Sequence, residues 1–282
     1  MTLRKVSKAV SGMPAVDGAG VHLTRVLGPQ TVRDFDPFLM LDSFDSTNPE
    51  DYVKGFPMHP HRGIETITYL IEGQIEHQDS LGNQGTINPG ESQWMTAGSG
   101  ILHQEMPKAA PRMLGLQIWL NLPQTEKMTH PTYFDIKGNM IRAKQEDFGV
   151  VRVLSGRYKD AAGVEPPHWQ ADIWDITLEQ GKEVALVTRQ DDNVFVFLIL
   201  GDALIDDDVY AEKTAVLFGP GDEINIKAAD GVCRFLYFAG KPIKESVAWG
   251  GPIVMNTGEE LEKAFSELQH GTFIKHNAVA KD

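Results

Sequence analysis

Short apolar segments separated by turn residues recur along the whole chain. The segments are rich in β-branched and aromatic residues, and several of them alternate between apolar and polar positions. They span residues 65–71, 115–120, 150–154, 173–178, 194–200 and 234–238. Glycine, proline, asparagine and aspartate are frequent between them. This alternation of strand-like segments and turns predicts an all-β fold of the sandwich or barrel type.

One segment near the C-terminus follows a helical period instead. Residues 257–268 begin with Thr257, a suitable N-cap, and Glu260 stands three residues later, where it completes a capping box. The apolar positions of this segment are Leu261, Ala264, Phe265 and Leu268. They have the i, i+3, i+4, i+7 spacing of one helix face. We therefore expect a short C-terminal helix that packs this face against the rest of the fold.

An internal repeat predicts two copies of one small β-domain. Residues 69–73 (YLIEG) are followed by a Pro-Gly-Glu turn at 89–91, and residues 197–201 (FLILG) are followed by a Pro-Gly-Asp turn at 220–222. The same order at a similar separation is typical of a duplication. We place the boundary in the turn-rich stretch 131–144. The predicted domains span residues 1–135 and 136–282, and the second includes the helix.

The candidate chemistry lies in two pairs of residues in the first half. His59 and His61 form an H-x-H pair, and His103 and Glu105 form an H-x-E pair. Because alternate residues of a strand point to the same face, each pair presents two donor side chains to one side of a sheet. Two such strands lining one barrel would bring three imidazoles and a carboxylate to one point. That donor set suits Fe(II), and also Mn, Ni, Cu or Zn.

Charge and cysteine content exclude several classes of function. Asp and Glu outnumber Lys and Arg by 39 to 26, which gives a net charge of −13. This argues against a broad basic surface for nucleic acid and against binding to an anionic membrane. The one cysteine, Cys233, excludes a disulfide within the chain and a Cys-based zinc or iron–sulfur site. With no apolar run long enough to span a membrane and no apolar secretory signal, we expect a cytoplasmic protein.

The segments around the two pairs resemble the pirin family, a bicupin group within the cupin superfamily. The resemblance is carried by PMHPHRG at 57–63, QWMTAGSGILHQE at 93–105 and LNLP at 120–123, with further matches at 36–43 and 251–257. It covers both halves of the chain and is densest in the first. The resemblance implies two cupin-type β-barrels packed face to face, an all-β bicupin to which the short C-terminal helix is added.

The resemblance also implies a function for the first barrel. Matched residue by residue, His59, His61, His103 and Glu105 would hold one metal ion, which is usually iron in this family. Many pirins are similar to quercetin 2,3-dioxygenases, which open a flavonol ring with O2. We therefore expect an Fe(II)-dependent enzyme that acts on a flavonol and O2, with Glu105 as the base. The alternative is a non-catalytic, redox-sensitive regulator that binds a protein partner, either a metabolic enzyme or a transcription factor.

A second carboxylate, Glu65, leaves one alternative open. The general cupin pattern places a ligand Glu a few residues after H-x-H, where Glu65 stands, whereas pirin-like proteins take the carboxylate from H-x-E. We favour Glu105 as the ligand and leave open whether Glu65 joins the metal site or supports it as a neighbour. The second half has no H-x-H pair, and His168 is its one comparable histidine, so we expect no metal there.

We also expect an apolar pocket beside the metal, because large apolar residues lie close in sequence to the two pairs. They are Phe56, Met58, Trp94, Met95, Ile101 and Met106. A pocket lined by aromatic and methionine side chains suits a flat aromatic substrate. The alternative is that these side chains only fill the interior of the barrel.

Overall fold

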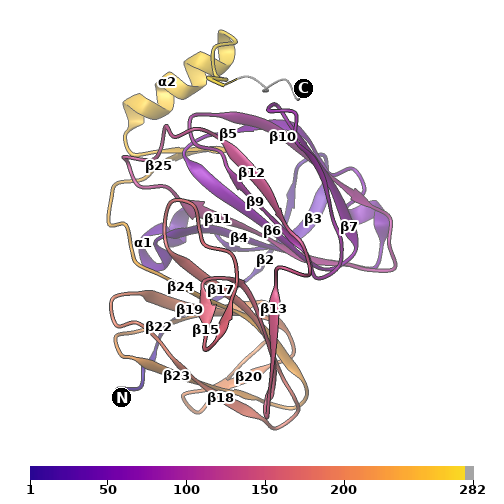
Figure 1. Cartoon of the computed structure of the whole chain (residues 1–282), viewed down its shortest axis with the longest axis vertical. Coiled ribbons are helices and arrows are strands. Elements are labelled where there is room, and N and C mark those ends of the chain that lie inside the picture. Colours follow the sequence, from indigo (N-terminus) through magenta and orange to yellow (C-terminus); the bar gives the residue numbers. More distant parts are fainter. Residues whose placement is uncertain (277–282) are drawn as a thin grey trace. The chain divides into compact units, whose positions relative to one another are not determined.

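The computed structural model describes residues 1–276, which fold into two compact units (Figure 1). Unit 1 comprises Met1–Met13, Asp34–Asp36 and Asn139–Pro242, and unit 2 comprises Pro14–Arg33, Pro37–Gly138 and the part of Ile243–Asp282 that is described. Both units are built almost entirely from strands. None of the described helices is long and apolar enough to cross a membrane.

Unit 2 contains two sheets and the H-x-H and H-x-E pairs. The larger sheet has the strand order β12 (Thr132–Ile136), β9 (Ser92–Thr96), β6 (Ile64–Glu72), β11 (Met113–Asn121), β4 (Phe38–Ser46), β3 (Val21–Leu27) and β2 (Met13–Asp17). The smaller sheet has the order β5 (Phe56–His61), β10 (Ile101–Lys108), β7 (Gln74–Asp79) and β8 (Gln84–Ile87). Short helices η1 (Pro29–Thr31), α1 (Val32–Phe35) and η2 (Pro49–Asp51) lie in the connections. The tail adds the hairpin β25 (Ala248–Gly250) and β26 (Ile253–Met255) and the helix α2 (Gly258–Gln269).

Unit 1 repeats the same plan. Its larger sheet has the order β1 (Val6–Ser11), β22 (Thr214–Phe218), β19 (Asn193–Leu200), β24 (Cys233–Gly240), β17 (Ala171–Leu178), β14 (Gly149–Ser155) and β13 (Arg142–Glu146). Its smaller sheet has the order β18 (Glu183–Val187), β23 (Glu223–Ala228), β20 (Ala203–Ile205) and β21 (Asp208–Tyr210). A further hairpin joins β15 (Arg157–Tyr158) and β16 (Ala161–Ala162).

The duplication predicted from the sequence is therefore visible in the sheets. Each unit has one seven-stranded and one four-stranded sheet, and the strands correspond one by one in order. The strand halves of the paired motifs end equivalent central strands, because Gly73 follows β6 and Gly201 follows β19. Both glycines have positive φ, 95° and 72°, which a residue with a side chain rarely adopts. The Pro-Gly turns do not correspond: residues 89–91 precede β9, whereas residues 220–222 follow β22, the counterpart of β9. The predicted strand segments all fall within observed strands of these sheets.

The ends of the chain do not follow a division at residue 135. β1 pairs with β22, from Ser11 opposite Thr214, and so the N-terminal segment closes the sheet of unit 1 (Figure 1). The C-terminal segment, which the sequence analysis assigned to the second domain, belongs to unit 2 with its helix. The backbone N–H of Val254 in β26 donates to the carbonyl of Arg62 (3.1 Å). Local hydrophobic patterns cannot predict these pairings, because the partners lie far apart in sequence.

The C-terminal helix forms as predicted. The hydroxyl of Thr257 accepts a hydrogen bond from the N–H of Glu260, and the Glu260 carboxylate accepts one from the N–H of Thr257, which confirms the capping box. Ala264 is fully buried against β26, whereas Phe265 at the edge of the stripe stays 37% exposed. The apolar stripe of α2 thus packs within unit 2.

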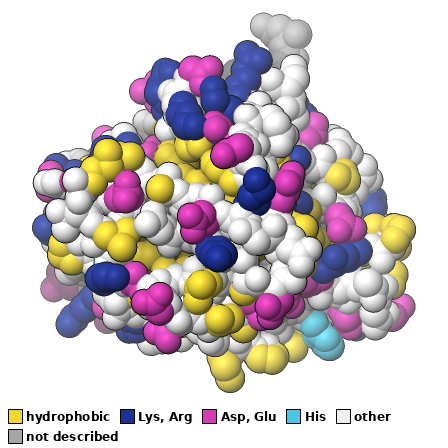
Figure 2. Space-filling view, turned by 90° about the horizontal axis from the view of Figure 1, so that it is seen from below, with side chains coloured by type: hydrophobic (Ala, Val, Ile, Leu, Met, Phe, Trp, Pro, Cys, Tyr) yellow, Lys and Arg dark blue, Asp and Glu magenta, His cyan; other side chains and the backbone are white. Residues whose placement is uncertain are grey.

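Each unit buries its own apolar core. In unit 1 a continuous cluster fills the space between both sheets, and it includes Cys233, whose thiol is buried. Burial raises the pKa of this thiol to about 12, so it is an inert apolar group at neutral pH. On the surface, the face drawn in Figure 2 carries acidic and basic side chains interspersed among apolar and uncharged ones.

Candidate metal centre

Three of the predicted ligands meet between β5 and β10. The two strands pair antiparallel, with His59 opposite His103 and His61 opposite Ile101. The ring centroids of His59 and His103 are 4.4 Å apart, and those of His61 and His103 are 5.0 Å apart. Their candidate ligand nitrogens all lie within 4.8 Å of one another, and in the described chain these imidazoles form the group that could hold a metal ion. The three imidazoles therefore converge, as the alternation of side chains along the strands predicted.

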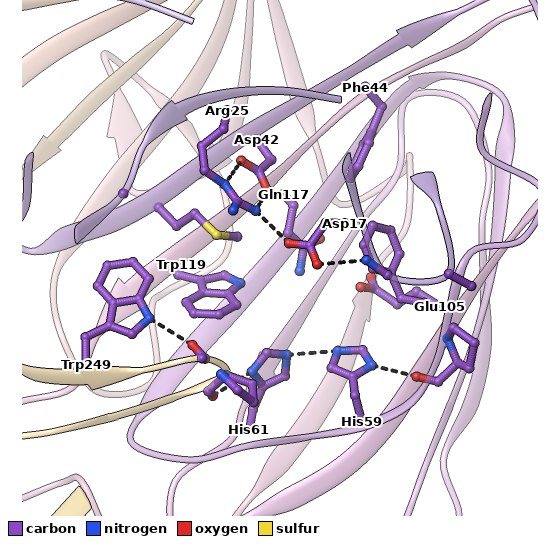
Figure 3. A pocket seen from close by; sticks show the side chains of 18 of the residues that line it. Asp17, Arg25, Asp42, Phe44, His59, His61, Glu105, Gln117, Trp119 and Trp249 are labelled. Carbon is purple, nitrogen blue, oxygen red and sulfur yellow. Dashed lines mark hydrogen bonds and ion pairs between the residues drawn. The ribbon is translucent and has the colours of Figure 1, made fainter. Parts of the chain in front are cut away.

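The hydrogen bonds of His59 and His61 aim one lone pair of each ring at the same point. Nδ1 of His59 lies 2.9 Å from the carbonyl of Pro57, and Nδ1 of His61 lies 3.0 Å from the carbonyl of Pro252. Because a carbonyl only accepts, each Nδ1 carries the hydrogen and each Nε2 carries a lone pair. The two Nε2 atoms are 3.1 Å apart (Figure 3).

Two facing lone pairs at this distance repel each other unless a cation binds both. Nitrogens bound at right angles to one metal at about 2.1 Å are separated by about 3.0 Å, close to the observed spacing. The pair of imidazoles therefore fits a metal ion as it stands.

His103 supplies a third neutral imidazole. It is fully buried, and neither of its ring nitrogens has a hydrogen-bond partner within the described part of the chain. Burial lowers the pKa of His61 to about 3 and that of His103 well below its usual value, so both rings are neutral. A buried polar atom without a partner costs about 1–3 kcal/mol. Binding of a metal by His103 would remove this cost for one of its nitrogens.

Glu105 lies on the same side of β10 as His103. It is 5% exposed and, with His59 and His61, lines one cavity of unit 2. Its Oε1 accepts hydrogen bonds from the hydroxyl of Thr68 (2.7 Å) and from the amide of Gln93 (2.8 Å). The carboxylate lies outside the tight group of three imidazoles, so its role as the fourth ligand remains a prediction.

Glu65 points elsewhere. It is fully buried on β6, and its Oε1 accepts a hydrogen bond from the hydroxyl of Thr96 (2.8 Å). Burial raises the pKa of Glu65 to about 7, against the opposing effect of the hydrogen bond from Thr96. It does not join the group of imidazoles.

The cavity beside the imidazoles has a volume of about 630 Å³, and aromatic side chains form part of its wall. The Trp119 ring meets the His61 ring edge to face with centroids 5.0 Å apart, and the Trp249 ring lies 5.6 Å from that of Trp119. Figure 3 shows these two indoles on one side of the imidazoles and Glu105 on the other. Further apolar lining comes from Met40, Phe44 and Phe56. Its size lies in the ordinary range for small-molecule sites.

A charged cluster forms the opposite wall of the cavity. Nε and Nη2 of Arg25 donate to the two carboxylate oxygens of Asp42, at 2.9 and 2.7 Å, and Nη2 also donates to Asp17 (2.7 Å). The amide of Gln117 lies beside this cluster (Figure 3). The cavity thus offers aromatic surfaces together with polar groups that suit a hydroxylated ligand.

The cavity lining differs from the sequence expectation. Phe56 lines the cavity as predicted, but Met58 is 48% exposed and Met106 lines a separate depression. The other three, Trp94, Met95 and Ile101, are fully buried in the protein. The two tryptophans of the cavity were missed. Trp119 follows the alternation of its strand, a usable signal, whereas Trp249 comes from the tail and carries no local signal.

The tail also fixes the carbonyl that holds His61. The guanidinium of Arg62 donates to the carbonyls of Ser99 and Phe273, both at 2.8 Å, and pairs with Glu267 at 2.8 Å. Its plane lies 4.2 Å from the centroid of the Phe273 ring. Buried Lys127 donates to the carbonyls of Gly63 and Val254, at 2.8 and 3.1 Å. These contacts tie the residues after His61 to the segment after Pro252.

Sequence reasoning also missed a third same-face pair, His77 and Asp79 on β7. β7 pairs with β10 so that His77 stands opposite Glu105 and Asp79 stands opposite His103. The ring centroids of His77 and His103 are 5.3 Å apart. The i, i+2 rule that identified the other pairs would have identified this H-x-D pair as well.

The strands of unit 1 that correspond to β5 and β10 bury apolar side chains. By strand order these strands are β18 and β23. Their buried residues are Val184, Leu186, Ile224, Ile226 and Ala228. All of these belong to the apolar core of unit 1. The duplicated fold therefore carries the three-imidazole group in unit 2.

Known proteins resemble the chain over its whole length. The family model for Pirin matches residues 20–120, and that for the Pirin C-terminal cupin domain matches residues 173–274. A pirin-like protein of Caulobacter vibrioides is 42% identical over 277 residues, which cover 97% of this chain and 100% of that protein. The chain belongs to the pirin family.

Other pirin-family relatives carry an enzyme's name. A protein of Pseudomonas aeruginosa named "Putative quercetin 2,3-dioxygenase" is 40% identical and covers 95% of this chain and 97% of its own length. A crystal structure of a quercetin 2,3-dioxygenase from Acinetobacter baumannii superposes with a TM-score of 0.88 at 30% identity, covering 96% of this chain and 98% of that one. Together with the duplicated sheets, these matches confirm the predicted bicupin fold.

Proposed function

We propose that this pirin is a metal-dependent dioxygenase that opens the ring of a quercetin-like flavonol with O2 at a mononuclear iron site. The observation that carries the proposal is the convergence of three imidazoles beside a cavity that is lined in part by aromatic side chains. The name of the Pseudomonas aeruginosa relative and the match to the Acinetobacter baumannii structure support it.

His59, His61 and His103 would hold the iron together with Glu105. When bound, the metal supplies Lewis acidity toward the substrate hydroxyl and one-electron chemistry for O2. The hydrogen bonds from His59 and His61 to backbone carbonyls fix both tautomers, so these rings need not reorganise when the metal enters.

The cavity walls orient the flavonol. Trp119 and Trp249 present aromatic surfaces against which a flat ring system packs, and their burial of the substrate excludes water from the reacting carbons. On the polar wall, Asp17 accepts hydrogen bonds from hydroxyl groups of the substrate, and the amide of Gln117 donates to such groups.

Glu105 is the base that takes the proton of the flavonol hydroxyl. Its Oε1 is held by Thr68 and Gln93, and we assign the proton transfer to Oε2. Removing the proton gives an electron-rich ring that reacts with O2. Both atoms of O2 enter the phenolic ester, and the hydroxyl-bearing carbon of the ring leaves with its own oxygen as carbon monoxide, so the balance needs no external reductant.

An aerobic assay with quercetin tests the proposal. Protein loaded with iron should consume the flavonol, measured by its absorbance, and release an equal amount of carbon monoxide. The His61→Ala variant should do neither. Protein that holds iron at one equivalent without flavonol turnover would overturn the enzymatic proposal and favour the redox-sensitive regulator.

A further inference from the structure

We propose that His77 and Asp79 form a hydrogen-bonded chain behind His103, which orients this imidazole and makes it a stronger metal ligand. The inference rests on the proposed metal centre and extends it to two residues that touch neither the metal nor the substrate. It follows from three buried ring nitrogens that lack partners.

Both residues face the interior between the sheets. The side chains of His77 and Asp79 are fully buried, at 0% exposure each. β7 lies between β10 and β8 in the smaller sheet, and its inward side chains therefore lie next to those of β10. Solvent cannot satisfy their polar atoms, so these atoms must be paired within the protein.

The surroundings of Asp79 fix the tautomer of His77. Oδ1 of Asp79 accepts the backbone N–H groups of Leu81 (2.9 Å) and Asn83 (3.0 Å), and Oδ2 accepts the side-chain amide of Asn83 (2.9 Å). Nε2 of His77 lies 3.4 Å from Oδ2. A carboxylate held by so many donors acts as an acceptor, so Nε2 carries the hydrogen. Nδ1 of His77 is then a lone-pair acceptor.

The lone pair on Nδ1 of His77 needs a donor, and the ring N–H of His103 needs an acceptor. Nδ1 of His77 has no partner among residues 1–276, and neither do the two ring nitrogens of His103. When one nitrogen of His103 binds the metal, the other carries the hydrogen. A single N–H···N bond from His103 to His77 would satisfy both rings.

The ring separation suits this bond. Two imidazoles joined end to end by an N–H···N bond of about 3 Å have ring centroids about 5 Å apart. The His77 and His103 centroids are 5.3 Å apart, and those of His59 and His61, whose nitrogens lie 3.1 Å apart, are separated by 4.8 Å. A rotation of the His103 ring would bring the two nitrogens into line.

The other face of His77 is held by Tyr133. The two rings stack with centroids 4.3 Å apart and planes 13° from parallel. The Tyr133 hydroxyl donates to Asp135 (2.5 Å), and Gly85 packs so closely that a Cβ there would lie 2.3 Å from that hydroxyl. The plane of His77 is therefore set before any metal binds.

Unit 1 provides an internal comparison. By strand order, β20 corresponds to β7, and its buried side chains are Ala203 and Ile205. Both are buried in the apolar core of that unit. The buried side chains of this strand thus include a histidine and a carboxylate in the copy of the fold that carries the imidazole group, and they are aliphatic in the other copy.

An acceptor behind a ligand imidazole strengthens the metal bond. It increases the electron density on the ring and fixes its orientation, and loss of such a partner typically lowers metal affinity by about 10–100-fold. The stronger donor also favours the more highly charged metal. Removal of the chain should therefore raise the midpoint potential of bound iron.

The test compares His77→Phe, Asp79→Asn and His77→Asn. Phe keeps the stacking on Tyr133 but has no acceptor, and Asn at position 79 donates to His77, which turns the Nδ1 lone pair of His77 into a second N–H facing His103. Both variants should bind Ni(II) about 10–100-fold more weakly in chelator competition and should raise the midpoint potential of bound iron. His77→Asn keeps an acceptor at the position of Nδ1 and should stay within a few-fold of wild type.

Gln78→Ala is the matched control, since Gln78 is exposed on the same strand. Unchanged affinity and potential in folded His77→Phe and Asp79→Asn would overturn the inference, and if His77→Phe does not fold, Asp79→Asn decides it. Because the readouts are affinity and potential, wild-type protein that binds metal but does not turn over quercetin refutes the dioxygenase and leaves this test intact.

Discussion

Replacement of Arg62 should destabilise unit 2 and leave the stability of unit 1 unchanged. Its side chain is 2% exposed and joins β5 to the C-terminal segment through two backbone carbonyls and Glu267, whose side chain is 15% exposed. In Arg62→Met, Glu267 keeps its ion pair with Lys275 (2.9 Å), but both carbonyls lose a charged donor. A buried polar group left without a partner costs about 1–3 kcal/mol, so the two carbonyls together cost about 3–5 kcal/mol, a large share of the 5–15 kcal/mol that stabilises an ordinary domain.

Hydrogen exchange of the metal-free protein measures this effect unit by unit. The free energy of opening should fall by about 3–5 kcal/mol for amides of β10 and β26 and stay unchanged for amides of β19 and β24. Arg112→Met is the matched control, because Arg112 makes the same kind of pairs with Asp45 and Glu72 at the surface, where the expected cost is below about 1 kcal/mol. A loss below 1 kcal/mol for Arg62→Met, or an equal loss in both units, would refute the conclusion that Arg62 holds β5 to the C-terminal segment.

Three further predictions concern the site and its surroundings. Glu105→Gln should retain iron, measured by metal analysis, and lose flavonol turnover; full turnover would exclude Glu105 as the base. Trp249→Leu should raise KM for quercetin about tenfold or more with unchanged iron content, and an unchanged KM would remove Trp249 from the binding wall. Because burial raises the pKa of Glu65 to about 7, the folded state binds more protons than the unfolded state between pH 4.5 and 7, and the wild type loses stability as pH rises through that window. Glu65→Gln should abolish up to about 3 kcal/mol of this loss, seen as a flatter Tm profile in metal-free protein.

Local patterns were sufficient for the elements and for the imidazole group. Period-two alternation identified the strands, and the capping box around Thr257 identified the helix, because both depend on neighbours along the chain. The convergence of His59, His61 and His103 followed from strand parity once two strands were assumed to line one barrel. The same rule identifies His77 and Asp79 as a further same-face pair.

The remaining features depend on pairings between distant segments. Neither the assignment of β1 to unit 1 nor that of the tail to unit 2 has a local signal, because an edge strand reads the same whichever sheet it joins. For this reason the sequence does not predict that Trp249 lines the cavity. Met58 and Trp94 were predicted to line it and do not, because side-chain direction depends on register and bulges. The register of β5, β10 and β7 is set by how these strands pair, which no local pattern encodes.

The exchange of chain ends has a consequence for synthesis on the ribosome. β1 emerges first but pairs with β22, and Ser11 and Thr214 are separated by about 200 residues. At 5–20 residues per second, its N-terminal strand waits roughly 10–40 s for its partner. Pro252, which orients His61, and Trp249 are made later still. Neither unit is complete until more than 240 residues have emerged, so a metal ion would meet a finished imidazole group only after β26 has paired.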